Sequence, residues 1–186
     1  MNAPAPGSTL RLFVALDLPS PARDALARFR GVAADPSLWR PMADESFHVT
    51  LAFLGARPSE DVERTAQVLR RLDPWSAPRL ALGDALLLPS RAARVLTVAV
   101  VDPEGGLGAL QAQVSAALAV AGVFAPEARS FRPHVTVARL RSGARPPRAL
   151  QAKPEALQFR AGPVTLYRSV IGRGGAVYEP LFARGG

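Results

Sequence analysis

The chain contains no cysteine among its 186 residues and only two histidines, His48 and His134. The absence of cysteine excludes disulfides, thiol catalysis and cysteine-based metal sites. No apolar run approaches the roughly 20 residues that a helix needs to cross a bilayer. Residues 1–9 are polar and proline-rich and lack the basic and apolar regions of a signal peptide, so we expect a flexible tail on a cytoplasmic protein.

Lysine is almost absent as well. Lys153 is the single lysine, so arginine supplies the other 22 of the 23 basic residues, and the net charge is +8. A basic protein favours polyanionic partners, and the planar guanidinium fork of arginine matches phosphate. A GC-rich genome would produce the same arginine excess. The charge therefore permits a nucleic-acid partner without indicating one.

The length and the hydrophobic content of 48% are sufficient for one buried core, so we expect a single domain over residues 10–184. Apolar runs bounded by glycine or proline predict strands at 11–16, 47–54, 80–88, 95–101, 131–140, 164–171 and 176–182. Helical spacing of apolar residues predicts helices that end near 32, 72 and 121. Hairpin-length strands mixed with helices indicate an α+β fold with mostly antiparallel sheets.

One short motif occurs twice. Residues 47–52 read FHVTLA and residues 133–138 read PHVTVA, with the two histidines 86 positions apart, from 48 to 134. Each copy lies on a predicted strand after a helix and a loop. The repeat suggests two related halves that face one another, which would make the domain bilobal.

Alternate residues of a strand point to the same side, so His48 and Thr50 should share one face, and His134 and Thr136 should share another. The same rule predicts that Phe53 lies on the buried face. Two such strands side by side would place two imidazoles and two hydroxyls around one cleft. One imidazole can take a proton from an attacking water while the other protonates a leaving oxygen, and the hydroxyls can bind phosphate oxygens. That set suits in-line displacement at a phosphodiester.

A metal site is the competing interpretation of two histidines. Metal sites usually include a third protein ligand such as a carboxylate, and neither repeat carries Asp or Glu on the face of its histidine. We therefore expect no metal and no cofactor.

The motifs resemble those of the 2H (two-histidine) phosphoesterases, and within them the LigT/ThpR-type RNA 2′,3′-cyclic phosphodiesterases, also called the 2′-5′ RNA ligase family. The similarity covers the opening strand at 12–19, the first motif at 47–55 after Trp39, and the central strand at 94–96. It continues through the second motif at 131–139 and the closing strand at 175–181. The likeness therefore spans nearly the whole chain.

This resemblance implies a bilobal, pseudo-two-fold α+β fold with both His-x-Thr strands in a central cleft. It implies metal-independent hydrolysis of an RNA 2′,3′-cyclic phosphate end to a 2′-phosphate, with His48 as the acid and His134 as the base. The pseudo-symmetry of the pair permits the opposite assignment as well. The family motif also carries an arginine that falls on Arg139 here, as a phosphate-binding residue beside Thr50 and Thr136. Strict alternation would point Arg139 away from His134, so a bend in the strand is required.

Several alternatives stay open. The chain could join tRNA halves through a 2′–5′ bond, act on a small cyclic nucleotide, or bind RNA or nucleotides without catalysis. We expect a monomer that acts on RNA, tRNA fragments included, and has no membrane partner. The candidates for contact with RNA phosphates are Arg129, Arg132, Arg141, Arg145 and Arg148, and those for stacking on a base are Phe13, Trp39 and Tyr178.

Overall fold

The computed structural model describes residues 7–126, 128–147, 149–150, 152–172 and 175–186. Residues 1–6 of the expected tail lie outside this part, as does Arg148. The strands of the described residues are β1 (Thr9–Asp17), β2 (Trp39–Pro41), β3 (His48–Pro58), β4 (Arg79–Leu88), β5 (Val95–Val101), β6 (His134–Leu140), β7 (Gln158–Arg160), β8 (Val164–Gly172) and β9 (Gly175–Arg184). The helices are α1 (Ser20–Ala33), α2 (Asp61–Arg70) and α3 (Gly106–Val120), with a 3₁₀ turn η1 (Asp44–Ser46). None of these helices is long and apolar enough to span a membrane.

The strands form two sheets, of order β3–β1–β8–β9 and β2–β6–β5–β4–β7, and all neighbouring strands are antiparallel. The α+β class with antiparallel sheets is therefore confirmed. The two sheets share one arrangement, because the pair β3–β1 in the first corresponds to the pair β6–β5 in the second. Each His-x-Thr motif lies on the first strand of that pair.

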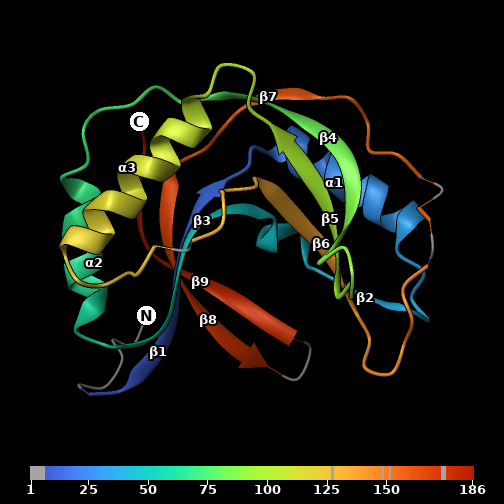
Figure 1. Cartoon of the computed structure of the whole chain (residues 1–186), viewed down its shortest axis with the longest axis horizontal. Helices are drawn as coiled ribbons and strands as arrows, with labels where there is room; N and C mark the ends of the chain where they lie inside the picture. The colour runs from blue at the N-terminus through green and yellow to red at the C-terminus, as the bar shows by residue number, and fades with distance from the viewer. Residues whose placement is uncertain (1–6, 127, 148, 151, 173–174) are drawn as a thin grey trace.

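Helices α1 and α3 pack crosswise on the two sheets (Figure 1). Helix α1 follows β1 of the four-stranded sheet but packs against β6 of the five-stranded sheet. Helix α3 follows β5 of the five-stranded sheet but packs against β3 and lies beside α2. Each of these two helices thus covers one sheet, although the strand that precedes the helix belongs to the other sheet.

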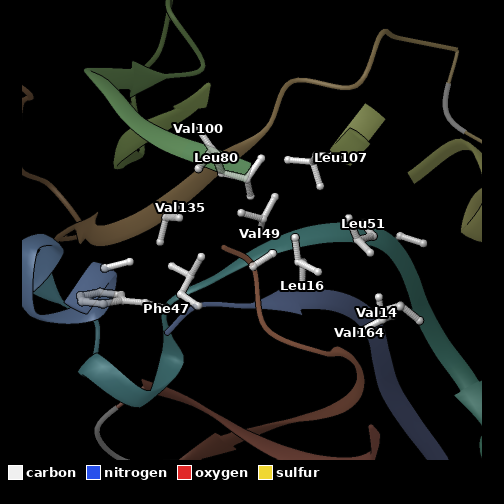
Figure 2. Packing of buried hydrophobic residues seen from close by; sticks show 14 of the residues in the cluster. Val14, Leu16, Phe47, Val49, Leu51, Leu80, Val100, Leu107, Val135 and Val164 are labelled. Atoms are coloured by element: carbon white, nitrogen blue, oxygen red, sulfur yellow. The ribbon is translucent and has the colours of Figure 1, made fainter. Parts of the chain in front are cut away.

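The core lies between the sheets and behind both motifs. Val49 and Val135 are fully buried and belong to one apolar cluster with Leu16, Leu80 and Val100 (Figure 2). Burial of a valine contributes roughly 1.5–3 kcal/mol. Each motif strand is therefore held from behind by its apolar residues, and its polar residues face the other way.

Several strand boundaries differ from the sequence prediction, and two of the departures have a clear physical reason. Gly55 does not end its strand, because it adopts φ +75° at an irregularity in the pairing with β1, and β3 continues to Pro58. A glycine takes this left-handed conformation without steric cost. Strands β2 and β7 have three residues each, too few to show an alternating pattern in the sequence.

Candidate active site

A cleft of about 420 Å³ between the two sheets contains all five residues that the sequence predicts for the site. They are His48 and Thr50 from β3 and His134, Thr136 and Arg139 from β6. All five are half-buried. Strands β3 and β6 lie beside each other although they belong to different sheets. The fold thus brings together two copies of a motif that are far apart in the sequence.

Each motif strand carries a β-bulge directly after its threonine. On β3, Thr50 pairs with Ala15 but Ala52 pairs with Val14, which leaves Leu51 as the extra residue. On β6, Thr136 and Ala138 pair with the consecutive residues Thr97 and Leu96, so Val137 is the extra residue. An extra residue shifts the side-chain alternation by one position. The residue three positions after each threonine therefore lies on the face of the histidine.

The two bulges explain one prediction and correct another. Arg139 lines the cleft with His134 and Thr136, and the bulge is the bend that this placement requires. Phe53 was expected on the buried face, and this is wrong. Its side chain is 43% exposed and lines the cleft, because the bulge at Leu51 turns it to the face of His48.

Both imidazoles are held by their Nδ1 atoms in the same way. Nδ1–H of His48 donates to the carbonyl oxygen of Ser46 at 2.8 Å, and Nδ1–H of His134 donates to that of Arg132 at 2.7 Å. A carbonyl oxygen only accepts hydrogen bonds, so each Nδ1 carries a proton. In a neutral imidazole Nε2 is then the proton acceptor. Nε2 of His48 lies 3.2 Å from Oγ1 of Thr50, whose hydroxyl donates to it.

His48 lies among aromatic rings. Its centroid is 4.9 Å from that of Phe13 and 5.3 Å from that of Tyr178, with Tyr178 approaching edge-on. Burial is the largest cause that lowers the pKa of His48 to about 4; the charges of Arg139 and His134 act in the same direction, and the hydrogen bond to Ser46 opposes them. The imidazole of His48 is therefore neutral at pH 7 in the free protein.

The sequence profile of the 2′-5′ RNA ligase superfamily matches residues 18–172, which include both motifs and the central strands. The chain belongs to this superfamily. Named relatives align with it over most of its length. It is 33% identical to the RNA 2′,3′-cyclic phosphodiesterase of Escherichia coli over 174 residues, which cover 92% of this chain and 93% of that protein.

A second relative is longer. The chain is 33% identical over 162 residues to an RNA 2′,3′-cyclic phosphodiesterase of Geobacillus stearothermophilus; the match covers 84% of this chain but only 51% of that protein. Among solved structures, E. coli LigT in complex with 3′-AMP superposes with a TM-score of 0.80 at 29% identity. That superposition covers 96% of this chain and 98% of LigT. The bilobal LigT-type fold that the resemblance implies is thereby confirmed.

A polar network behind His48 was missed at the sequence level. The Asp17 carboxylate accepts hydrogen bonds from the hydroxyls of Thr165 and Tyr167, both at 2.8 Å. Burial raises the pKa of Asp17, although both hydrogen bonds oppose it. The Tyr167 ring stacks on Phe13, so the network supports the ring on which His48 lies. The available signal was one acidic residue directly after the apolar run 12–16.

The candidates for base stacking have other positions. Trp39 is only 1% exposed and belongs to the core, and Phe13 is 4% exposed beneath His48. Tyr178 lines the cleft but packs edge-on against His48. Phe53 is the exposed ring of the cleft, and the guanidinium of Arg11 lies 4.8 Å from its centroid. Arg11 and Arg40 also line the cleft, and sequence reasoning did not single them out.

Among the described residues, no aspartate or glutamate lines the cleft. In the same part of the chain, no group of three or more histidine, cysteine, aspartate or glutamate side chains has a geometry suited to a metal ion. Three arginines, Arg11, Arg40 and Arg139, instead make the walls positive. The side chains of the cleft are suited to bind an anion and to transfer protons.

Proposed function

We propose that the chain hydrolyses the terminal 2′,3′-cyclic phosphate of RNA to a 2′-phosphate, with His48 and His134 as the catalytic residues. One observation carries the proposal. Two imidazoles, each fixed through Nδ1 to the backbone, face one arginine-lined cleft. Their Nε2 atoms, of which that of His48 accepts from the Thr50 hydroxyl, remain for proton transfer. Relatives at 31–33% identity carry the name of this activity.

In the proposed step, Nε2 of His134 takes a proton from water as the water oxygen forms its bond to phosphorus. The bond between phosphorus and O3′ breaks on the opposite side, and Nε2–H of His48 protonates O3′. Each proton transfer contributes roughly 10²- to 10⁴-fold in rate. His48 must be protonated for this role. Because its pKa is about 4 in the free protein, substrate binding has to raise the pKa of His48.

Thr50, Thr136 and Arg139 are proposed to bind the non-bridging oxygens of the phosphate. Their side chains face the cleft beside the two imidazoles. The threonine hydroxyls donate hydrogen bonds and the guanidinium adds charge, so both stabilise the negative oxygens of the transition state. In the resting cleft the Thr50 hydroxyl is bound to Nε2 of His48, and a phosphate oxygen would replace that partner.

We also propose that the protein acts as a cytoplasmic monomer without metal or cofactor. The residues proposed for catalysis and phosphate binding all come from one chain, and the described cleft lining lacks the carboxylate that a third metal ligand would supply. Light scattering coupled to gel filtration should give the mass of one chain, and a dimer would contradict this part of the proposal.

The test is an assay of a short RNA with a 2′,3′-cyclic phosphate end in excess chelator. We expect turnover to persist and chromatography to identify a 2′-phosphate product. Loss of activity in chelator with recovery on adding a divalent ion would refute the acid–base mechanism, and a 3′-phosphate product would refute the assigned leaving oxygen. Absence of turnover with retained RNA binding would favour a non-catalytic binding protein.

A further inference from the structure

A second, larger groove continues from the cleft. It has a volume of about 1030 Å³ and shares Arg40 and Arg139 with the cleft. Three further arginines, Arg91, Arg94 and Arg141, line it, and the described residues of its lining include no aspartate or glutamate. We call this surface the arginine groove. Arg91, Arg94 and Arg141 are exposed, so their guanidinium groups are open to a ligand.

The backbone brings these arginines together. Arg40 and Arg139 are direct partners in the pairing of β2 with β6. The amide of Leu140 donates to the carbonyl of Arg94 at 2.8 Å, which fixes Arg94 next to the same strand. Like charges on directly opposite strand residues destabilise a sheet. Sheet pairing therefore holds a group of cations that repel one another.

The described residues do not neutralise this charge. Their ion pairs involve other arginines, and none includes Arg40, Arg91, Arg94 or Arg139. Arg141 donates through Nε to a carbonyl oxygen, that of Pro36, at 2.8 Å. A set of guanidinium groups without carboxylate partners around a concave surface is the expected arrangement for a ligand with several negative charges.

We propose that the arginine groove binds the phosphodiester backbone of the RNA immediately 5′ to the nucleotide that carries the cyclic phosphate. This inference rests on the proposed function. A terminal nucleotide in the cleft is connected to the rest of its strand through its 5′ oxygen, and the groove is the cation-lined continuation of the cleft. No aromatic ring of the described residues lines the groove, so it offers phosphate contacts and no stacking surface for bases. The groove favours an RNA strand over a mononucleotide without reading its sequence.

The test compares two substrates and two double variants. The substrates are a 2′,3′-cyclic mononucleotide and a pentanucleotide that ends in the same cyclic nucleotide. The test variant is Arg91→Gln/Arg94→Gln, because neither residue lines the catalytic cleft. The matched control is Arg71→Gln/Arg79→Gln, which removes the same charge from exposed arginines that line neither cleft nor groove.

We expect the test variant to lose roughly tenfold in kcat/KM for the pentanucleotide. The slope of log kcat/KM against log salt concentration should become shallower by about 0.7 for each RNA phosphate that the variant no longer neutralises. Hydrolysis of the mononucleotide should stay within about twofold of wild type, and the control should match wild type on both substrates. An equal loss on both substrates, or an unchanged rate on the pentanucleotide, would overturn the proposal.

A binding measurement separates this inference from the proposed function. Fluorescence anisotropy of a labelled pentanucleotide with a 2′-phosphate end reports on the groove without turnover. If wild type binds this RNA more tightly than the test variant but hydrolyses neither substrate, the groove is supported and the proposed function fails. If wild type hydrolyses both substrates but the two proteins bind the RNA equally, the function stands and the groove is refuted.

Discussion

A phosphate anion bound in the cleft should return the pKa of His48 from about 4 toward its ordinary value of about 6.5. In the free protein, burial among Phe13, Tyr167 and Tyr178 disfavours the imidazolium, and the charge of Arg139 adds to that effect. A bound phosphate places a negative charge beside the ring and favours the protonated form. Binding of the phosphate would then itself cause the protonation of His48, the proposed acid.

The attraction of one bound phosphate is large enough to produce this rise in the pKa of His48. A rise in pKa from about 4 to about 6.5 corresponds to about 3.4 kcal/mol, since one pKa unit is about 1.36 kcal/mol. Two opposite unit charges about 4 Å apart attract by about 4 kcal/mol at an effective dielectric constant of about 20. One phosphate monoanion next to His48 is therefore sufficient to restore the pKa, and His48 does not have to be protonated in the free protein.

NMR titration of the imidazole signals measures this directly, because the chain has only two histidines. A His134→Asn variant assigns the His48 signal. We expect its midpoint to lie near pH 4 in the free protein and to rise by about two pH units with saturating adenosine 2′-phosphate. As a control, Arg139→Gln should raise the midpoint of the free protein, because it removes a charge that lowers it.

Two results would refute the reasoning. A midpoint near pH 6.5 in the free protein would show that the aromatic rings do not bury the imidazole enough to disfavour its charge. A midpoint that stays near pH 4 when the nucleotide is bound would show that His48 cannot be the acid at neutral pH. In that case His48 would be the base and His134 the acid, which the pseudo-symmetric cleft permits.

Three further predictions concern the same residues. His48→Ala and His134→Ala should each lose most of kcat while remaining folded by circular dichroism, and the double variant should be little worse, because the two act as one unit; multiplicative losses would contradict this. Thr50→Val and Thr136→Val should each lower kcat/KM by roughly 5- to 150-fold, the equivalent of about 1–3 kcal/mol, and keep both limbs of the pH–rate profile; loss of a limb would argue against phosphate binding. The pKa of His48 in the folded protein lies below its value in the unfolded chain. The contribution of His48 to stability is therefore complete above about pH 6.5 and is lost as the pH falls toward 4. Urea unfolding should give a free energy of unfolding that is roughly 2 kcal/mol smaller at pH 5 than at pH 8. His48→Gln should remove that difference, and an unchanged pH dependence would show that other groups cause it.

The sequence alone predicts much of the site because its chemistry is local. The two His-x-Thr motifs together contain both histidines of the chain. The alternation of side chains along a strand places His48 with Thr50 and His134 with Thr136. The boundaries of β5 agree fully with the prediction, because a run that is apolar except for Thr97 lies between the charged residues Arg94 and Asp102. Local patterns of this kind can be recognised in the sequence without knowledge of the fold.

The remaining features depend on partners that are distant in the sequence. The bulges at Leu51 and Val137 arise from pairing with β1 and β5, so the exposed position of Phe53 could not be predicted from its own strand. The contact of Asp17 with Tyr167 spans 150 residues. The arginine groove combines residues from β2, β6 and the segment before β5, which no window of the sequence brings together.

The crosswise helices also affect how the protein can fold. Because α1 covers β6 and α3 covers β3, each half of the chain lacks part of its own core until the other half is present. Strands β8 and β9 at the end of the chain complete the sheet that β1 begins, which interlocks the halves further. A chain cut between α2 and β4 should therefore yield fragments that fold only when mixed. The position of His48 beside His134 is in this way a property of the whole molecule, and the two imidazoles come together only when folding is complete.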